Sequence, residues 1–366
     1  MRAVTEIFPD AAVSVFSKND PAQPERKLSA RPVGFDCTGW WPRGIQRTLA
    51  YSRLLAVNAL RDRPDLIVST HVNFAQMGYW LQKFAGMRFA AVAHGVDVWG
   101  EDVRGIRAAD MLRALKAADR VLAVSHFTRD RLIADVGMAE EKVGLLPNTF
   151  DEEQFVPAPK PHFLLRRFGL QPKERVILTV ARLASADRYK GYDQVLHVLP
   201  VVRQTVPDVR YILAGAGPDR ARIETLIREL RLENCVTLAG YVPDHELPAL
   251  YNLADVFAMP SKGEGFGIVF LEALACGKPV IAGNQDGSVD AVLNGKVGVL
   301  VDPYKLKELE QALILTLMGT HPLAILRDPA ALRREVVGAY GFQRFKESVA
   351  RNLATLSADF GIRNSE

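Results

Sequence analysis

Short apolar runs alternate along the chain with longer stretches in which apolar residues recur every three or four positions. A short run rich in Val, Ile, Leu and Ala is typical of a buried strand, and the longer period is typical of an amphipathic helix. In the first half of the chain the short runs predict strands at 13–16, 33–36, 66–69, 89–93, 121–124 and 143–146. The longer stretches predict helices at 44–60, 73–84, 107–117 and 126–135.

The same rhythm returns in the second half, after a break at 147–161. This stretch begins Pro-Asn-Thr-Phe and continues acidic and proline-spaced, which is the composition of an interdomain linker. Beyond it we expect strands at 176–181, 210–214, 236–239, 256–258, 280–282 and 299–301. Because strands that alternate with helices form parallel sheets covered by helices, the pattern predicts two α/β domains, residues 1–155 and 156–338.

The composition supports two domains and a reducing environment. The chain has 366 residues, of which 48% are hydrophobic and 24% charged, so it is able to fill two ordinary cores. Its three cysteines, at 37, 235 and 276, form no Cys-x-x-Cys pair, which argues against a disulfide framework or a zinc site. No apolar run approaches the roughly 18 residues of a membrane span, and a signal-peptide pattern is missing. We therefore expect a cytoplasmic protein.

The positive charge lies in the N-terminal part of the chain. The net charge is +4, and residues 1–150 hold 20 Lys and Arg against 16 Asp and Glu, which accounts for the whole excess. Such an excess favours peripheral contact with an anionic membrane. The basic segment 104–120 has apolar residues at helical spacing and is a candidate for a membrane-surface helix. Its aspartates and modest apolar face favour an ordinary domain helix instead.

The chemically most informative segment is 261–272, which reads Ser-Lys-Gly-Glu-Gly-Phe-Gly-Ile-Val-Phe-Leu-Glu. It places Glu264 and Glu272 at opposite ends of a glycine-rich turn that runs into an apolar helix near 268–276. The glycines allow backbone N–H groups to approach a ligand, and the helix start offers the positive end of its dipole to an anion. The segment therefore predicts a phosphate site.

The two carboxylates do not fit a glycoside hydrolase. Eight helical residues span about 12 Å, whereas the carboxyl pairs of such enzymes stand roughly 5 to 9.5 Å apart. We interpret them as two clamps on one elongated ligand, Glu264 on the hydroxyls of a sugar and Glu272 on a ribose, with a diphosphate between. A nucleotide sugar has this form. The alternative is a capped amphipathic helix with glutamates on its surface.

These residues also carry a family resemblance. Glu264, seven intervening residues and Glu272, followed by Ala-Leu-Ala-Cys-Gly-Lys-Pro-Val-Ile, resemble the donor-site signature of the family 4 retaining glycosyltransferases of GT-B fold. The Glu-x7-Glu spacing alone is weak, but the Gly-Phe-Gly turn and the small-residue strand make the match specific. The resemblance covers nearly the whole chain. It implies two Rossmann-like domains facing an interdomain cleft, and a C-terminal helix within 339–366 that crosses back to the first domain.

The resemblance also implies how the donor is bound. Arg182, in Thr-Val-Ala-Arg-Leu, and Lys190, in Tyr-Lys-Gly, match the family's cationic pair for the donor diphosphate, although outside this context they would be two surface cations among 46. Fixed cations stabilise the charge that grows on a leaving diphosphate, so no metal is expected, and the chain contains no Asp-x-Asp triplet. The other donor-binding residues implied are Gly215, Gly217, Tyr241, Val242, Gly265, Phe266, Gly267 and Ile268.

The first domain offers candidates for the reacting sugar and the acceptor. His94 follows a buried strand in Ala-Val-Ala-His-Gly-Val-Asp, and ligands bind at the carboxyl edge of a parallel sheet. The resemblance implies that His94 faces the transferred sugar, while Asp97 is expected to orient its imidazole or to receive the acceptor hydroxyl. His71 and Asn73, after the preceding strand, are candidates for the acceptor side. The alternative for each is a structural residue at a strand end.

One departure from the family concerns the N-terminus. Family members open with a strand and a Gly-Gly loop, whereas this chain begins Met-Arg-Ala-Val-Thr-Glu-Ile, which reads like the tail of a helix. We therefore expect the N-terminal domain to lack its first strand and its Gly-rich loop.

The expected function is that of a metal-independent hexosyltransferase. It would move a sugar with retention from a UDP- or GDP-sugar to a glycan or lipid-linked acceptor, in cell-envelope or exopolysaccharide biosynthesis, at the cytoplasmic face of the membrane. The alternatives are a non-catalytic, truncated nucleotide-sugar-binding protein and a nucleotide-sugar epimerase or phosphorylase of the same fold. We see no basis for nucleic-acid binding.

Overall fold

A computed structural model describes residues 1–18, 34–38, 44–99 and 106–358 of the chain. The first residue of the strand expected at 33–36, the first two of the segment 104–120 and the end of 339–366 lie outside them. The chain forms two compact units: unit 1 (Met1–Val124, Thr128–Leu146 and Phe345–Glu366) and unit 2 (Ser125–Phe127 and Pro147–Arg344). Apart from Ser125–Phe127, unit 2 begins at Pro147, the first residue of the segment 147–161 in which the sequence places the linker.

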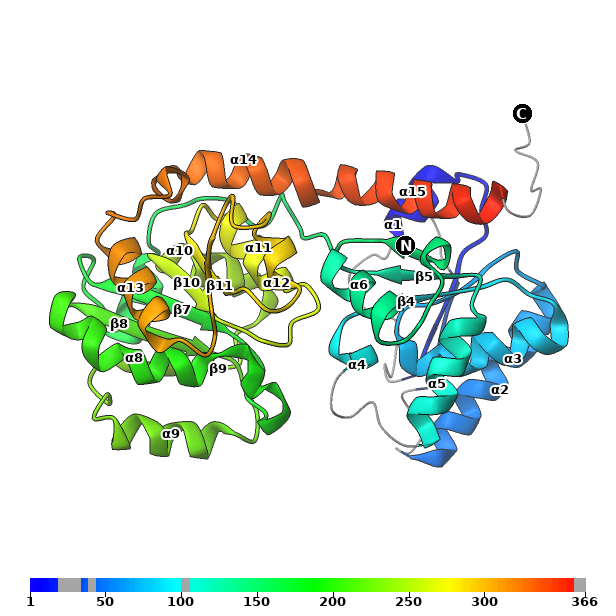
Figure 1. Cartoon of the computed structure of the whole chain (residues 1–366), viewed down its shortest axis with the longest axis horizontal. Helices are drawn as coiled ribbons and strands as arrows, with labels where there is room; N and C mark the ends of the chain where they lie inside the picture. Colours follow the sequence, from blue (N-terminus) through cyan, green and yellow to red (C-terminus); the bar gives the residue numbers. More distant parts are fainter. Residues whose placement is uncertain (19–33, 39–43, 100–105, 359–366) are drawn as a thin grey trace. The chain divides into compact units, whose positions relative to one another are not determined.

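Unit 1 is built on a parallel four-stranded sheet with the order β3-β4-β5-β6 (Figure 1). A separate parallel pair, β1-β2, accompanies it. The strands of unit 1 are β1 (Ser14–Ser17), β2 (Gly34–Cys37), β3 (Ile67–Ser69), β4 (Phe89–Ala93), β5 (Arg120–Ala123) and β6 (Val143–Leu145). Its helices are α1 (Arg2–Ile7), α2 (Ile45–Asp62), α3 (Ala75–Ala85), α4 (Val96–Trp99), α5 (Ile106–Ala117) and α6 (His126–Ala134), with short 3₁₀ turns η1 (Val72–Phe74) and η2 (Glu140–Lys142).

The core of unit 1 lies between its sheet and helices α3, α5 and α6. Phe89, Ala91 and Ala93, at alternate positions of β4, point into it because successive side chains of a strand face opposite sides. Ala114 and Leu115 of α5 are fully buried in the same core. The described part of the basic segment 104–120 is therefore an ordinary domain helix, as its composition favoured.

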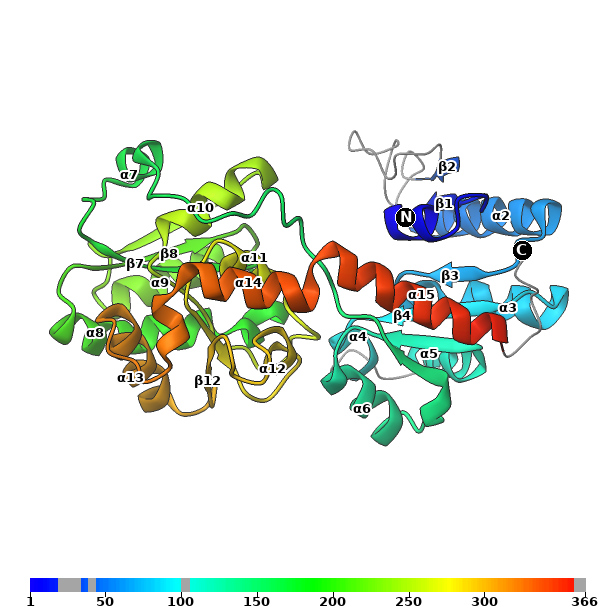
Figure 2. The same cartoon turned by 90° about the horizontal axis from the view of Figure 1, so that it is seen from above.

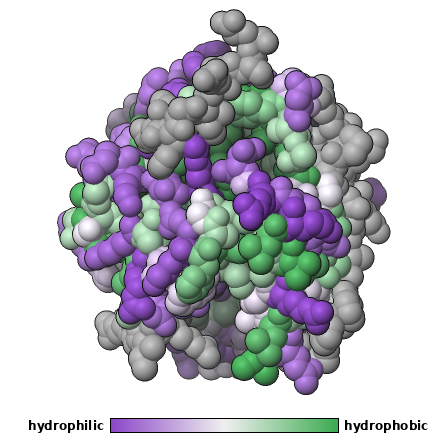
Figure 3. All heavy atoms as spheres, turned by 90° about the vertical axis from the view of Figure 1, so that its right-hand side faces the viewer, coloured by the Kyte–Doolittle hydropathy of each residue, from purple (hydrophilic) through white to green (hydrophobic). Residues whose placement is uncertain are grey.

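The C-terminal helix α15 (Phe342–Ala358) belongs to unit 1 from Phe345 onward and runs along it in Figure 2. Asn352 fixes it there: its side-chain amide donates to the Leu145 carbonyl at 2.8 Å, and Arg120 donates to its oxygen at 3.1 Å. Gly144 is needed at this contact, because a Cβ there would stand 2.1 Å from the Asn352 side chain. On the side of unit 1 that Figure 3 shows, hydrophobic and hydrophilic residues lie side by side on the surface.

Unit 2 contains a parallel six-stranded sheet with the order β12-β11-β10-β7-β8-β9. Its strands are β7 (Arg175–Val180), β8 (Val209–Ala214), β9 (Val236–Gly240), β10 (Val256–Met259), β11 (Val280–Gly283) and β12 (Val299–Val301). Its helices are α7 (His162–Phe168), α8 (Tyr192–Thr205), α9 (Arg220–Glu229), α10 (Leu247–Leu253), α11 (Ile268–Ala275), α12 (Ser288–Ala291), α13 (Leu306–Leu317) and α14 (Pro329–Tyr340), with 3₁₀ turns η3 (Ser185–Lys190), η4 (Asp244–Glu246) and η5 (Ala324–Arg327).

The strand order of unit 2 reverses beside β7. This strand comes first in the unit, yet it lies centrally, with β8 and β9 on one side and β10 to β12 on the other. In parallel sheets of this type the crevice for ligands opens at the carboxyl ends of the strands where the order reverses. The loops that follow β7 and β10 are therefore placed for binding.

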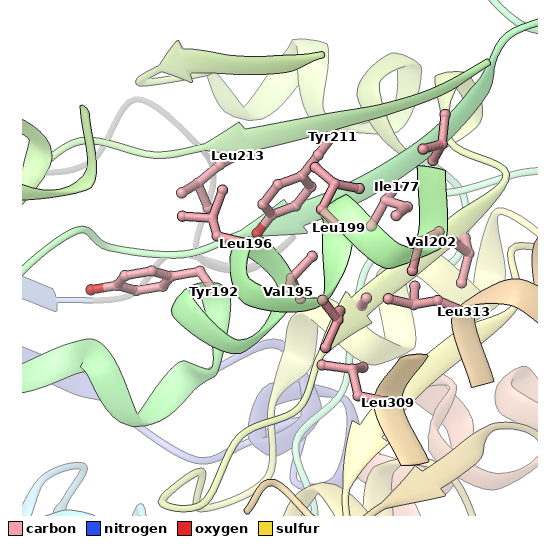
Figure 4. Close-up of a cluster of buried hydrophobic side chains, with 14 of the residues drawn as sticks. Ile177, Tyr192, Val195, Leu196, Leu199, Val202, Tyr211, Leu213, Leu309 and Leu313 are labelled. Atoms are coloured by element: carbon pink, nitrogen blue, oxygen red, sulfur yellow. The ribbon is translucent and has the colours of Figure 1, made fainter. Parts of the chain in front are cut away.

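A large apolar core holds this sheet against α8 and α13 (Figure 4). Leu196 and Leu199 of α8 and Leu313 of α13 are completely buried in it. Tyr211 of β8 is also buried, and it satisfies its hydroxyl by donating to Thr179 Oγ1 at 2.9 Å. All twelve strands in the described residues overlap strands that the apolar pattern predicted.

None of the helices in the described part of the chain combines the length and the apolar content that a membrane span requires.

Candidate functional site

The carboxyl edge of the unit 2 sheet brings together loops that are far apart in sequence. Arg182 follows β7, the glycine turn at 215–217 follows β8, the segment 261–267 follows β10 and the loop 284–287 follows β11. All strands of this sheet are parallel, so these loops share one edge.

Lys190 and Glu264 form an ion pair at this edge. Lys190 ends η3, and its Nζ contacts Glu264 Oε1. Only 13% of each side chain is exposed. The ring of Tyr189 lies beside them, with its centroid 5.2 Å from Lys190 Nζ. Burial and the negative charge of Glu264 raise the pKa of Tyr189, so it stays a neutral phenol. Two of the sequence-predicted donor residues thus meet in a partly desolvated position.

Arg182 lies on the same edge but stays open to solvent. Its Nη2 donates to Asp187 at 2.9 Å, and 78% of its side chain is exposed while Asp187 is buried. One face of the guanidinium is therefore held, and its other N–H groups point away from that bond. A guanidinium held in this way suits a phosphate, which it is able to bind with two parallel hydrogen bonds.

A buried carboxylate that the sequence reading overlooked organises the turn around Glu264. Asp286 has no exposed surface, and its Oδ2 accepts from the Glu264 backbone N–H and the Ser261 hydroxyl, both at 2.7 Å. Its Oδ1 accepts from the Ser288 backbone N–H at 3.0 Å and from the Ser288 hydroxyl. Asp286 thus ties the loop after β10 to the loop after β11. In the sequence, the Gly-Asn-Gln-Asp-Gly-Ser context of Asp286 signals only a turn.

The two loops also approach closely through their backbones. The Gly287 N–H donates to the Glu264 carbonyl at 2.8 Å, and a Cβ on Gly287 would stand 2.0 Å from the Gly265 carbonyl oxygen. Any larger residue at 287 would push the Glu264 turn away. This contact gives the glycine a physical role that its position in the sequence does not reveal.

The glycine turn after β8 packs in the same manner against the loop that carries Arg182. Gly215 has φ +139°, and a Cβ there would stand 1.7 Å from the Ala181 carbonyl oxygen. A Cβ on Gly217 would stand 2.0 Å from the Leu183 carbonyl oxygen. Both glycines predicted at this turn are therefore required for close packing beside Arg182, which allows the loops to approach each other.

A second buried carboxylate, Asp219, fastens this glycine turn to the segment that ends in Lys190. Arg188 Nη2 donates to it at 2.8 Å, Arg222 Nη2 at 2.7 Å and the Tyr192 hydroxyl at 3.2 Å. These donors, Arg222 first, hold the pKa of Asp219 well below its usual range. Asp219 was not predicted, and its Gly-Pro-Asp context signals only a turn.

The start of α11 follows the Glu264 turn directly. Gly267 adopts φ +89°, which favours glycine, and a Cβ there would clash with the Phe270 ring. Phe266 is buried edge-to-face against Tyr340, at a centroid distance of 5.1 Å, whereas Ile268 is 40% exposed. The turn is anchored by Phe266, and the first residue of the helix reaches solvent.

Glu272 lies two turns further along α11 and has its own partner. The Tyr251 hydroxyl donates to Glu272 Oε2 at 2.7 Å. Burial raises the pKa of Glu272, with the Tyr251 hydrogen bond opposing and the negative charge of Asp244 adding to the effect. Asp244 belongs to the loop after β9 that also contains Tyr241, which is 72% exposed, and Val242. Glu272 and this loop are thus neighbours, while Glu272 has no direct contact with Lys190 or Glu264 among the hydrogen bonds of the described residues.

The predicted residues of unit 1 gather at the carboxyl ends of β3 and β4. The rings of His71 and His94 stack at 5.9 Å, and His94 Nε2 lies 2.8 Å from the Thr70 carbonyl oxygen. The Asn73 backbone N–H donates to His71 Nδ1 at 3.2 Å, and its side chain is exposed.

Asp97 was expected to orient the imidazole of His94 or to receive the acceptor hydroxyl. Its carboxylate accepts from the backbone N–H of His94, at 3.1 and 3.2 Å, and among the hydrogen bonds of the described residues it makes none to the ring. Burial raises the pKa of Asp97, which the hydrogen bond from His94 and the nearby imidazoles oppose. The ring of His94 is oriented by the Thr70 carbonyl instead. Asp97 therefore shapes the backbone after β4.

Among the described residues, no group of three or more His, Cys, Asp or Glu side chains is arranged to hold a metal ion.

Two models of known protein families match the chain. The model described as "Glycosyltransferase Family 4" matches residues 10–154, and the model described as "Glycosyl transferases group 1" matches residues 163–325. Together they cover most of both units. The chain belongs to the family 4 glycosyltransferases, as the motif around Glu264 and Glu272 indicated.

A curated relative is the GDP-mannose-dependent α-(1-6)-phosphatidylinositol monomannoside mannosyltransferase of Mycolicibacterium smegmatis. It is 34% identical over 236 residues, which are 62% of this chain and 60% of the relative. The matched part of the chain thus spans less than two thirds of the length of this relative.

Solved structures share the fold over a larger part of the chain. Sucrose-phosphate synthase from Thermosynechococcus elongatus is 24% identical with a TM-score of 0.78, covering 98% of this chain and 92% of that one. HepE from Anabaena, solved in complex with UDP-glucose, is 22% identical with a TM-score of 0.74, covering 88% and 86%. The chain therefore has the two-domain GT-B fold with parallel sheets that the sequence predicted.

Proposed function

We propose that the protein is a retaining glycosyltransferase that moves a hexose from a UDP- or GDP-sugar to a glycan or lipid-linked acceptor. The observation that carries the proposal is the ion pair of Lys190 and Glu264, held by Asp286 on a glycine turn at the start of α11. Lys190 supplies a cation, and the turn supplies a carboxylate and backbone N–H groups within the same loop cluster. A sugar diphosphate needs these three kinds of partner.

In the proposed reaction the bond between the sugar carbon and the diphosphate oxygen breaks, and the electron pair leaves with the diphosphate. Lys190, Arg182 and the backbone N–H groups at Gly267 and Ile268 stabilise the growing negative charge more in the transition state than in the ground state. The acceptor hydroxyl attacks from the same face, and its proton passes to the leaving diphosphate oxygen. These residues supply the positive charge, so we propose that the reaction needs no metal.

Two further residues would position the donor. We propose that Glu264 orients the sugar hydroxyls and that Glu272 accepts hydrogen bonds from the ribose, with Tyr241 and Val242 beside the base. Glu272 lies near Asp244, which belongs to the same loop as Tyr241 and Val242, and this supports the placement of the nucleotide. The mannosyltransferase relative is named for GDP-mannose and HepE was solved with UDP-glucose, which supports a nucleotide-sugar donor of either base.

In unit 1, we propose that His94 contacts the transferred sugar, and that His71, Asn73 and Asp97 line the acceptor side. The relative acts on a phosphatidylinositol-linked mannoside, according to its name. A lipid-linked acceptor would place the protein at the cytoplasmic face of an anionic membrane, in cell-envelope or exopolysaccharide assembly. We include this location in the proposal.

The test combines donor binding with turnover. Purified protein is titrated with UDP-, GDP- and ADP-sugars by calorimetry, and donor hydrolysis and the anomeric configuration of transfer products are followed by NMR. The parent should bind one class of donor and release sugar slowly. Lys190→Met and Glu264→Ala should each lower turnover roughly 10²- to 10³-fold.

The matched control removes an ion pair of the same unit that lies outside the loop cluster. Lys296 and Glu335 form such a pair at 2.7 Å on the exposed surface, so Lys296→Met and Glu335→Ala should leave turnover unchanged. If Glu264→Ala binds and hydrolyses the donors as well as the parent does, the clamp assignment is wrong. If the parent binds a donor and never turns it over, the protein is a nucleotide-sugar-binding protein.

A further inference from the structure

The ring of Tyr189 lies directly over the glycine turn that carries Glu264. A Cβ on Gly263 would stand 3.0 Å from two carbons of this ring, so position 263 has no room for a side chain unless the ring moves. The backbone joins the same two segments, since the Lys262 N–H donates to the Tyr189 carbonyl at 2.9 Å. Tyr189 therefore belongs to the loop cluster at the carboxyl edge of the unit 2 sheet, where the sequence pointed only to its neighbour Lys190.

The backbone that follows Tyr189 is held as closely. Gly191 has φ +83°, in the left-handed region that favours glycine, and a Cβ there would stand 2.3 Å from the Pro260 carbonyl oxygen. Lys190 Nζ lies 5.2 Å from the Tyr189 ring centroid, within the range of a cation–π contact. The position of the ring is thus set by the glycine turn, by the ammonium group and by the close approach of the two backbones.

The hydroxyl of Tyr189 has no acceptor in the part of the chain that the structure describes. Several tyrosines of unit 2 donate their hydroxyls to acceptors within the protein, as those at 192, 211, 251 and 340 do. Tyr189 is half-buried, yet its hydroxyl takes part in none of the hydrogen bonds of the described residues. Its oxygen is also not closed off from solvent. The O–H group is therefore available to donate to a ligand.

The charges around this hydroxyl show where in the loop cluster it lies. Burial and the negative charges of Glu264 and Asp187 raise the pKa of Tyr189, whereas the Arg182 guanidinium lowers it. Because such effects fall off with distance, the hydroxyl lies near both Glu264 and Arg182. In the proposed reaction Glu264 orients the sugar and Arg182 stabilises the diphosphate, so the bond that breaks joins the two parts of the donor that these residues contact.

We propose that Tyr189 is a further catalytic residue, whose hydroxyl donates a hydrogen bond to an oxygen of the phosphate that carries the sugar. This inference rests on the proposed function and deepens it, since it adds a neutral donor to the cations assigned there. Tyr189 transfers no proton in the reaction. The electron pair of the broken bond leaves with the diphosphate, and the proton of the acceptor hydroxyl passes to the leaving oxygen.

A neutral donor has a physical advantage in this loop cluster. Lys190 is paired with Glu264 and Arg182 with Asp187, so these four charged groups sum to zero. The leaving oxygen gains negative charge as the bond to the sugar breaks. An O–H group aimed at this oxygen stabilises that charge and brings no additional ion into a partly desolvated position.

The central variant is Tyr189→Phe, which removes the hydroxyl and keeps the ring beside Lys190. By calorimetry it should bind UDP or GDP roughly tenfold more weakly than the parent, because one hydrogen bond to a charged oxygen is lost. Affinity for UMP or GMP, which lack the second phosphate, should stay unchanged.

Turnover of the nucleotide sugar should respond more strongly than its binding. In Tyr189→Phe we expect kcat to fall roughly 10²-fold and KM to rise no more than about threefold, because the charge on the leaving oxygen is greatest in the transition state. Both effects should be the same between about pH 6 and pH 8, since the phenol stays protonated throughout.

The matched control is a tyrosine beside a cation at the same edge of the sheet. Tyr304 follows β12, is 65% exposed, and its ring centroid lies 4.6 Å from Lys262 Nζ. Tyr304→Phe should change neither diphosphate affinity nor kcat. A second variant, Tyr189→Leu, removes the ring together with the hydroxyl. If Tyr189→Phe behaves as the parent and only Tyr189→Leu loses turnover, the ring acts by packing alone and the proposal is wrong.

Two further outcomes separate this inference from the proposed function. If the parent turns over a donor and Tyr189→Phe loses affinity for UDP and UMP alike, the hydroxyl does not meet the second phosphate. The inference then fails while the proposed function stands. If the parent binds neither diphosphate, both fail together.

Discussion

The two units differ in how they hold their candidate functional residues. In unit 2 hydrogen bonds to two buried carboxylates hold the loops together. Asp286 and Asp219 each accept hydrogen bonds from three different residues. In unit 1 His94 and His71 stack near the surface, and the carboxylate of Asp97 accepts the backbone N–H of His94.

The proposed function accounts for this difference. A site that stabilises charge on a diphosphate gains from donors and cations that are fixed before the reaction, because they then need no reorganisation. A site that receives an acceptor is able to rely on fewer fixed contacts. We therefore interpret the loops of unit 2 that Asp286 and Asp219 hold together as the preorganised part of the molecule. The histidine cluster of unit 1 is then the adaptable part.

The largest expected effect comes from removing Asp286, the buried carboxylate that joins the loops after β10 and β11. Asp286→Ala leaves the Glu264 N–H and the Ser261 and Ser288 hydroxyls without their buried acceptor, so we expect unfolding of unit 2 to become easier by about 3 kcal/mol. Asp97→Ala in unit 1 removes a single acceptor and should cost about 1 kcal/mol. Urea unfolding measures both.

Two probes separate the units in this experiment. All four tryptophans, at 40, 41, 80 and 99, belong to the sequence of unit 1, whereas far-ultraviolet circular dichroism reports both units. Asp286→Ala should shift the circular dichroism transition more than the tryptophan transition, and Asp97→Ala the reverse. If each variant shifted both transitions equally, the contrast between a preorganised site in unit 2 and an adaptable site in unit 1 would be lost.

A smaller effect is expected in unit 1 on catalysis. His94→Ala should lower transfer to the acceptor roughly 10- to 100-fold, since a positioned histidine contributes at about this level or above. Calorimetric affinity for the nucleoside diphosphate should stay unchanged, because that part of the donor is assigned to unit 2. His197→Ala, on α8 with its Nδ1 2.7 Å from the Asp193 carbonyl oxygen, serves as a control histidine and should change neither. A loss of diphosphate affinity in His94→Ala would contradict the division of roles.

The smallest effect is a pH dependence of nucleotide affinity. The ribose hydroxyls would donate to the Glu272 carboxylate, which accepts fully only above its pKa, and burial raises that pKa. Affinity for UDP or GDP should therefore fall severalfold as pH drops, beginning at a higher pH than for an ordinary glutamate near 4.3.

Tyr251→Phe sharpens this prediction. The Tyr251 hydroxyl stabilises the charged carboxylate, so its removal should raise the pKa of Glu272 further and move the loss of affinity to higher pH. Glu272→Gln should bind more weakly without the pH dependence. An identical pH profile in the parent and in both variants would show that Glu272 does not meet the nucleotide.

Local patterns along the chain were sufficient for the elements and for the chemistry at their ends. Apolar periodicity predicted the strands of both sheets, because burial of a strand or helix face leaves its period in the sequence. The parallel arrangement then placed His94 at the end of β4, and Arg182 after β7, on the sheet edges. The family motif pointed to Lys190 and Glu264, which the structure joins as an ion pair.

Only the tertiary structure decided which distant residues support these groups. Asp286 and Asp219 look like turn residues in sequence, and their roles depend on burial against partners from other loops. Asp97 was expected to orient the imidazole or to receive the acceptor hydroxyl, and its bond to the backbone N–H of His94 depends on the path of the chain after β4. Periodicity is a local property of the chain, whereas these contacts depend on where separate segments meet.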